Sequence, residues 1–161
     1  MVWLGSTIGT ADGSRGDLDF ADPPLGSDWH EVPQGATRGP NCLVQENYVD
    51  CEFVGKDGVY YLVFGTEVTR KEVRRASTQE AAALPFGLHF GDSAARVRQQ
   101  MESLHSIELN YFELPADRAY AAELGTGLFL KNKLGVTFGL YFLFDKSDGL
   151  TVIGVTVGET G

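Results

Sequence analysis

The stretch VDCEFVGKDGVYYLVF, residues 49–64, decides the fold class that we expect for this chain. In residues 49–53, apolar side chains alternate with acidic ones, which is the pattern of a strand that buries one face. Asp57-Gly58 favours a tight hairpin turn, because this dipeptide tolerates the positive φ that such a turn requires. The apolar run at residues 59–64 completes a second strand, so the stretch predicts an antiparallel hairpin.

A Gly91-Asp92-Ser93 junction could begin either a phosphate-binding loop or a helix. A phosphate-binding loop would need further glycines and a lysine followed by serine or threonine, and this segment has neither. Val97, Met101 and Leu104 recur at the spacing of one helix face, and either polar side chain of the junction can cap a first turn. We therefore expect a helix over about residues 93–104 and no phosphate site.

Residues 66–84 allow two structures, because capping-box patterns favour a helix and alternating charges favour a strand. We expect a strand to about Val73, followed by a short helical turn before Pro85. The alternating charges of this predicted strand suit an exposed edge of the sheet. A basic cluster in this segment is assigned to a solvated face: Arg70, Lys71, Arg74 and Arg75.

The remaining pattern predicts strands near residues 107–112, 128–130, 136–144 and 150–157, a turn at 145–149 and a second short helix at 115–124. Residues 1–40 are rich in Gly, Asp, Pro and Ser, and we expect them to be irregular and loop-rich. Residues 1–161 are predicted to form a single α+β domain. Its antiparallel sheet of about five to eight strands would pack against the main helix and one or two short helices.

Acidic side chains dominate the first half of the chain. The formal net charge is −9, and residues 1–68 carry 11 acidic and 3 basic side chains. This excess disfavours nucleic acid as a partner and favours a protein with a basic surface. Two interpretations stay open: a solvated, loop-rich surface, or a docking face that includes Asp17, Asp19 and Asp22.

The compartment is not decided by the sequence. The longest mostly apolar run, residues 134–144, suits a strand and not a membrane span. The first residues lack the basic start and long apolar centre of a signal peptide. Cys42 and Cys51 could close a hairpin as a disulfide, or stay as thiols in a reducing compartment. The protein would be cytoplasmic if this start is native, and periplasmic if a signal peptide was removed.

No sequence pattern carries recognisable catalytic or metal chemistry. His30, His89 and His105 are too widely spaced to form a metal-binding motif. Residues 145–149 depart from a calcium loop, which needs its glycine one position later. No nucleophile elbow occurs, and no carboxylate pair has the apolar neighbours that would raise a pKa. We expect a protein that is not an enzyme and that uses no cofactor or metal.

The segments GDSAARV, residues 91–97, and NCLVQENYVDCEFVGKDGVYYLVFG, residues 41–65, carry a family resemblance. The helix-start segment is similar to the Gly-x-Ser/Thr-x-x-x-Val helix start of the beta-lactamase-inhibitor-like and outer-membrane assembly small-lipoprotein folds. The cysteine-containing segment resembles an inhibitor-family stretch, in which two cysteines flank a loop before an aromatic strand. The resemblance implies a helix or helix pair on an antiparallel sheet, and a protein-binding module that presents aromatic side chains and carries no cofactor.

Three function classes follow. The favoured one is a bacterial inhibitor or immunity-type protein that occludes a partner enzyme or toxin, with Trp29, Tyr48, Tyr60 and Tyr141 as candidate anchors. Strand aromatics, however, mostly fill cores. The alternatives are a cell-envelope structural or assembly module, and a ligand-binding or enzymatic domain with a site between helix and sheet.

Overall fold

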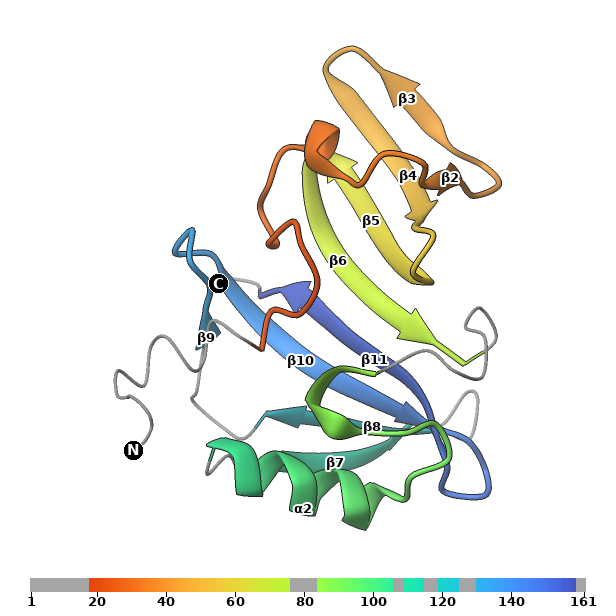
Figure 1. Cartoon of the computed structure of the whole chain (residues 1–161), viewed down its shortest axis with the longest axis vertical. Coiled ribbons are helices and arrows are strands. Elements are labelled where there is room, and N and C mark those ends of the chain that lie inside the picture. Colours follow the sequence, from red (N-terminus) through yellow and green to blue (C-terminus); the bar gives the residue numbers. More distant parts are fainter. Residues whose placement is uncertain (1–17, 76–83, 106–108, 115–118, 125–129, 159–161) are drawn as a thin grey trace.

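The computed structural model describes residues 18–75, 84–105, 109–114, 119–124 and 130–158 (Figure 1). The strands are β2 (Thr37–Arg38), β3 (Leu43–Gln45), β4 (Tyr48–Val54), β5 (Val59–Gly65), β6 (Glu67–Arg74), β7 (Leu109–Leu114), β8 (Ala119–Leu124), β9 (Leu130–Lys131), β10 (Thr137–Phe144) and β11 (Leu150–Val157). The helices are α2 (Ala94–His105) and two short 3-10 turns, η1 (Trp29–Glu31) and η2 (Pro85–Gly87). The predicted α+β class with an antiparallel sheet is confirmed.

All the described strands belong to one antiparallel sheet. Eight of them follow the order β2-β4-β5-β6-β11-β10-β8-β7, while β3 also pairs with β4 and β9 with β10. The predicted hairpin of residues 49–64 is confirmed as β4 and β5, with Val54 opposite Tyr60. Gly58 has a φ of 85° in its turn, and the Asp57 carboxylate accepts a hydrogen bond from the Val59 N–H at 3.0 Å. The Asp-Gly pair therefore forms this turn for the reason the sequence suggests.

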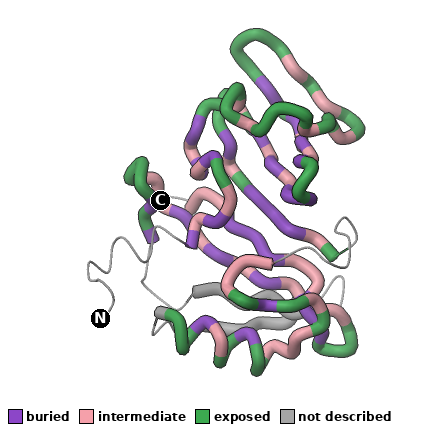
Figure 2. The backbone as a smooth tube through the Cα atoms, in the orientation of Figure 1, coloured by how far each residue is buried: buried purple, intermediate pink, exposed green. Residues whose placement is uncertain are grey.

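One face of the sheet carries the core. Along β10 every second side chain is buried, from Phe138 to Phe144, as expected for a strand with one covered face. Buried stretches of the backbone run along the central strands in Figure 2. Leu18 and Leu25 from the irregular N-terminal segment belong to the same buried cluster. That segment and α2 therefore contribute to the layer that covers this face.

The helix starts where the sequence predicts. The Ser93 hydroxyl accepts a hydrogen bond from the Arg96 N–H at 3.1 Å, which satisfies one of the free donors of the first turn. Val97 and Met101 are fully buried, but Leu104 is 45% exposed. The expectation that Leu104 belongs to the buried face is wrong, because the buried cluster includes Val97 and Met101 but not Leu104. The junction at residues 91–93 is a helix start.

The edge-strand prediction for β6 is wrong. β6 lies between β5 and β11, in the middle of the sheet. Lys71, assigned to a solvated face, has a completely buried side chain, and its ammonium lies 2.6 Å from Asp19. Arg74 is paired with Glu52 and Glu72 on the opposite face. Lys71 and Arg74 are thus neutralised by partners within the fold, so a central position costs less than the charge count suggests. Arg70 and Arg75 are exposed, as the sequence predicts for them. The helical turn expected after this strand lies outside the described residues.

The prediction of a short helix at residues 115–124 is also wrong for residues 119–124, the part of it that the structure describes. Residues 119–124 form β8, which is paired on one side with β7 and on the other with β10. Alanine-rich sequence favours a helix locally, but hydrogen bonding to strands on both sides outweighs that small preference. Among the described residues, no helix is long and apolar enough to cross a membrane.

Candidate binding face

The side of the sheet opposite the core is called the open face here. The pairing register places four of its residues in one row across β4, β5, β6 and β11: Glu52, Leu62, Arg70 and Thr156. The next row across the same strands and β10 contains Val54, Tyr60, Glu72, Gly154 and Tyr141. The side chains in these rows are partly or fully exposed except at Glu72 and Gly154. Because directly paired residues lie on the same side of a sheet, these rows form one continuous surface.

Arg74 holds the centre of the open face together. Its guanidinium makes a bidentate contact with Glu52, at 3.1 and 2.9 Å, and its Nε donates to Glu72 at 2.7 Å. The guanidinium carbon also lies 3.8 Å from the centre of the Tyr60 ring. Burial lowers the pKa of Arg74, but the hydrogen bonds to Glu52 and Glu72 outweigh it and raise that pKa above its usual value. The network therefore keeps its charge and fixes three side chains in place.

Tyr141 reaches across β11 into the same network. Its ring lies over Gly154, which has no side chain in the way, and its hydroxyl donates a hydrogen bond to Glu72. Burial and the Glu72 carboxylate both raise the pKa of Tyr141, so the phenol stays protonated. The open face thus presents a pre-organised array of aromatic rings and charged groups.

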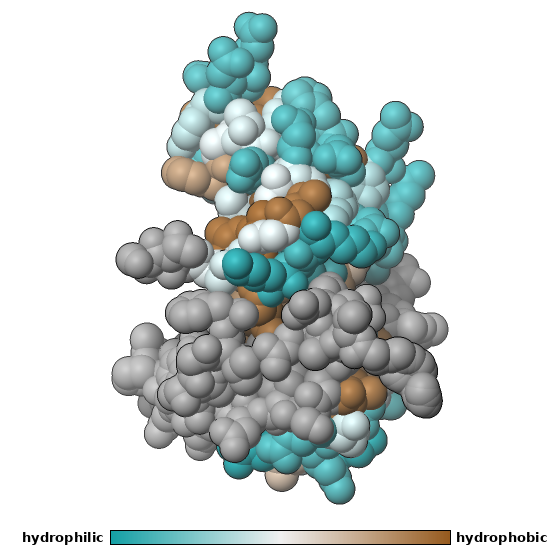
Figure 3. All heavy atoms as spheres, turned by 90° about the vertical axis from the view of Figure 1, so that its left-hand side faces the viewer, coloured by the Kyte–Doolittle hydropathy of each residue, from teal (hydrophilic) through white to brown (hydrophobic). Residues whose placement is uncertain are grey.

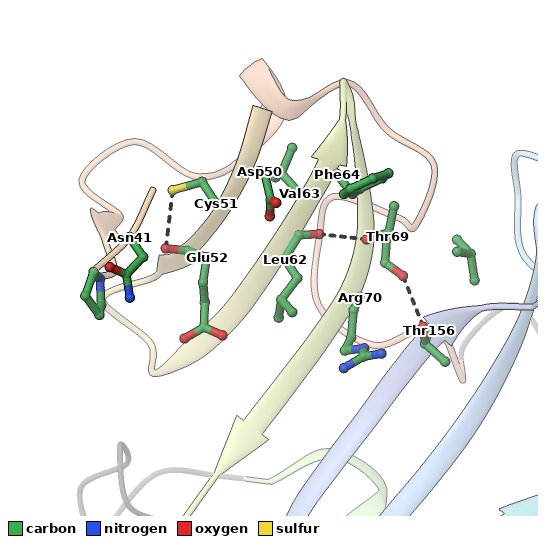
Figure 4. Close-up of a pocket in the computed structure, with 12 residues that line it drawn as sticks. Asn41, Asp50, Cys51, Glu52, Leu62, Val63, Phe64, Thr69, Arg70 and Thr156 are labelled. Carbon is green, nitrogen blue, oxygen red and sulfur yellow. Dashed lines mark hydrogen bonds between the residues drawn. The ribbon is translucent and has the colours of Figure 1, made fainter. Parts of the chain in front are cut away.

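A hollow of about 600 Å³ adjoins this array (Figure 4). Its lining includes Asp50 and Phe64, toward the top of Figure 4, and Leu62, Arg70 and Thr156 below them. Asp50 and Arg70 are exposed, and neither makes an ion pair within the described part of the chain. The hollow can therefore accept polar groups of either charge from a partner.

A disulfide between Cys42 and Cys51 fixes the border of the hollow beside β4. The Cα atoms of the two cysteines are 4.4 Å apart, the separation of a close cross-strand pair. Pro40 and Asn41, which directly precede Cys42, line the hollow together with Cys51. The bond thus ties the segment that carries Pro40 and Asn41 to β4.

The four aromatic residues predicted to bind a partner differ in their position and exposure. Tyr60 and Tyr141 lie in one row of the open face, and Tyr48 is exposed at the end of β4. Trp29 is half-buried, with its ring 6.1 Å from that of Phe53, so it serves partly as core. The sequence suggests these residues because Trp and Tyr are typical anchors of interfaces.

Three aspartates are also predicted to be docking residues, and the structure gives a different result for each of them. Asp22 is exposed, and Asp17 lies outside the described residues. The prediction that Asp19 is a docking residue is wrong, because its side chain is only 1% exposed and pairs with Lys71. Sequence reasoning missed Phe64, Arg70 and Arg74 as members of the face, since only the register shows that they adjoin the tyrosines.

The described residues contain no group of three or more His, Cys, Asp or Glu that could hold a metal ion. His30 hydrogen-bonds Asp28 at 2.6 Å, and hydrogen bonds from the His30 backbone and ring lower the pKa of Asp28. His89 is exposed. The Asp145 carboxylate accepts from the Ser147 and Gly149 N–H groups, each at 2.9 Å, so residues 145–149 form the expected turn.

Comparisons with known proteins give no match: no family model, no curated protein and no solved structure is similar to this chain.

Proposed function

We propose that this protein is a non-enzymatic protein-binding module of the inhibitor or immunity type, which docks its open face onto a partner enzyme or toxin. The observation that carries the proposal is the open face itself. Tyr60 and Leu62 from β5 and Tyr141 from β10 lie partly exposed, on strands whose other side is buried. Aromatic side chains held in place before binding lose little entropy on association and are typical anchors of interfaces.

Charge supports a basic partner. In residues 18–68, seven acidic side chains are exposed: Asp22, Asp28, Glu31, Glu46, Asp50, Asp57 and Glu67. Exposed basic side chains in the same range are Arg38 and Lys56. Hydrophilic side chains cover much of the upper part of the molecule in Figure 3. A field of one sign attracts an oppositely charged protein and raises its association rate.

The test is affinity capture with three versions of the purified protein. Leu62→Asp places a charge in the open face, and Leu134→Ser is the matched control, since Leu134 is an exposed leucine in the β9–β10 turn. We expect the wild type and Leu134→Ser to retain the same basic protein, and Leu62→Asp to bind it at least about tenfold more weakly. Equal affinity of all three, with unchanged melting temperatures, would rule out the open face as the docking surface.

Salt dependence tests the steering by charge. The association rate of the captured partner should fall as ionic strength rises, because exposed charges are screened. Glu31→Gln with Asp57→Asn, both exposed and outside the hollow, should flatten that dependence, while the dissociation rate should change little. An association rate that salt does not change would contradict the basic-partner part of the proposal.

A cell-envelope structural module is a second candidate. The Cys42–Cys51 disulfide favours it, because disulfides persist in oxidising compartments such as the periplasm. Co-purification with envelope proteins in place of one stoichiometric enzyme or toxin would favour this candidate over the first.

A further inference from the structure

Two hairpin ends meet at the upper end of the sheet in Figure 1. The β3–β4 hairpin closes with Gln45 opposite Tyr48, and the β5–β6 hairpin closes with Phe64 opposite Glu67. The Tyr48 and Phe64 rings contact each other edge to face, with their centres 5.8 Å apart. We call the surface formed by Leu43, Tyr48, Asp50, Phe64 and Glu67 the acidic tip.

Phe64 stands between two carboxylates. The register places Leu43, Asp50, Phe64 and Glu67 in one row across β3, β4, β5 and β6. Phe64 therefore has an acidic residue directly opposite it on each neighbouring strand, and paired residues project from the same side of the sheet. The Phe64 side chain is 59% exposed, although an apolar ring gains free energy by burial. A row of this kind has an apolar surface in its centre and negative charge on both sides.

The carboxylates of the acidic tip make no ion pair within the described residues, and acidic side chains outnumber basic ones around it. Glu46, Asp50 and Glu67 are exposed and make no ion pair with any described residue. The nearest basic side chain in the register is Arg70, which is exposed in the adjacent row and lines the hollow with Asp50 and Phe64, but it makes no ion pair with any of these carboxylates. Lys56 lies in the β4–β5 turn, at the opposite end of these strands. The tip is therefore complementary to a cation that also has a flat apolar surface.

We propose that the acidic tip binds an arginine side chain of the partner protein, with the guanidinium stacked on Phe64 and its N–H groups directed to Asp50 and Glu67. This inference rests on the proposed function and names the group that the partner presents. A guanidinium stacks on aromatic rings and donates in several directions within one plane, whereas a lysine ammonium is a compact, strongly hydrated charge. Arginine is therefore the basic side chain that fits a ring between two carboxylates.

The inference can be tested without the partner, by NMR titration of the full chain with the peptide acetyl-Gly-Arg-Gly-amide. Peptides with citrulline or lysine in place of arginine are the matched controls, since citrulline keeps the shape without the charge. We expect saturable shifts at the amides of Phe64, Tyr48 and Glu67 with the arginine peptide, weaker ones with lysine, and none with citrulline. Equal shifts with arginine and citrulline, equal shifts with arginine and lysine, or shifts located elsewhere would overturn the proposal.

Variants of the protein test separately how much the Phe64 ring and the two carboxylates contribute to arginine binding. Phe64→Leu keeps both carboxylates and should weaken arginine binding about two- to fivefold. Asp50→Asn with Glu67→Gln keeps the ring and should weaken it about two- to tenfold. Leu134→Ser should leave the affinity unchanged, and an equal loss in that variant would overturn the assignment.

The two proposals fail differently. If the arginine peptide shifts the acidic tip but Leu62→Asp does not affect partner capture, then the tip site stands and the open face is not the docking surface. If capture depends on Leu62 but the peptide leaves the tip unshifted, then the open face docks the partner and the arginine site is wrong.

Discussion

The ammonium of Lys71, in a central strand, lies 2.6 Å from the carboxylate of Asp19, in the irregular N-terminal segment, and both side chains are almost completely buried. Lys71 also donates to the carbonyl oxygens of Ala21 and Pro23, at 2.6 and 3.0 Å. The other carboxylate oxygen of Asp19 accepts from the Leu25 N–H and from Asn132, each at 2.9 Å. The charges are thus surrounded by partners, and the pair fastens the N-terminal segment to β6.

Breaking this pair should destabilise the protein strongly. Asp19→Asn and Lys71→Met each leave one buried charge without its counter-ion, and we expect each to lower the free energy of unfolding by about 3–5 kcal/mol. The double variant should lose clearly less than the sum of the two, because no uncompensated charge is left buried. Urea unfolding of the four proteins measures these differences.

Additive losses in the double variant would contradict this account of the pair. Arg98→Met is a suitable control, because Arg98 and Glu102 are half-exposed on α2 with 3.7 Å between Nε and Oε1. An exposed pair of this kind contributes about 0–1 kcal/mol, so this change should alter stability little.

Lys71 also shows where sequence reasoning reaches its limit. Alternation and the Asp57-Gly58 turn predict β4 and β5, and helical spacing with a polar cap predicts α2, because these signals are local. The sequence pattern wrongly assigns Lys71 to a solvated face, because its partner Asp19 is far away along the chain. No local pattern distinguishes a lysine that faces water from one that meets a buried carboxylate.

In the candidate site, too, local patterns identify some residues, but not the contacts between them. Tyr60 and Tyr141 could be proposed from the sequence, since each lies in a strand-like run. The sequence could not show that Arg74 lies over Tyr60 or that Tyr141 reaches Glu72, because both contacts depend on the register between strands. Register follows from side-chain packing and turns across the whole sheet.

Tyr61 should make stability depend on alkaline pH. Its hydroxyl donates to the Asp22 carbonyl oxygen at 3.2 Å, and burial, together with the Asp57 and Asp22 charges, raises the pKa of Tyr61 to about 12. In the unfolded chain this pKa is about 10. The folded state therefore keeps a proton that the unfolded state loses, so the stabilisation is complete below pH 10 and is lost as pH rises to about 12.

The measurement is the free energy of unfolding of the wild type and of Tyr61→Phe across this pH range. The wild type should lose roughly 1–3 kcal/mol more than the variant between the two pKa values. Tyr141 and Lys71, which also have shifted pKa values, are present in both proteins, so their contributions cancel. Parallel pH profiles would show that the Tyr61 phenol is not held protonated by the fold.

The Cys42–Cys51 disulfide should stabilise the fold by a modest amount. The bond closes a short loop, with a sequence separation of 9, and chain entropy predicts roughly 2–3 kcal/mol for a loop of this size. We expect a reducing agent to lower the melting temperature of the wild type and to leave that of a Cys42→Ser, Cys51→Ser variant unchanged. An equal response of both proteins to the reducing agent would mean that the bond does not contribute.

Gly154 should be needed for the position of Tyr141. A Cβ atom at residue 154 would collide with the Tyr141 ring, which lies over this glycine on its way to Glu72. Gly154→Ala should therefore displace the ring, break its hydrogen bond to Glu72 and cost about 1–3 kcal/mol. Gly139→Ala is the matched control, because Gly139 lies in the adjacent strand and a Cβ there meets no described atom within 4 Å. Adding Tyr141→Ala to Gly154→Ala should remove the collision, so the alanine at residue 154 should cost much less in that background. If Gly154→Ala and Gly139→Ala had equal effects on urea unfolding, the loss would reflect glycine in a strand and not the contact with Tyr141.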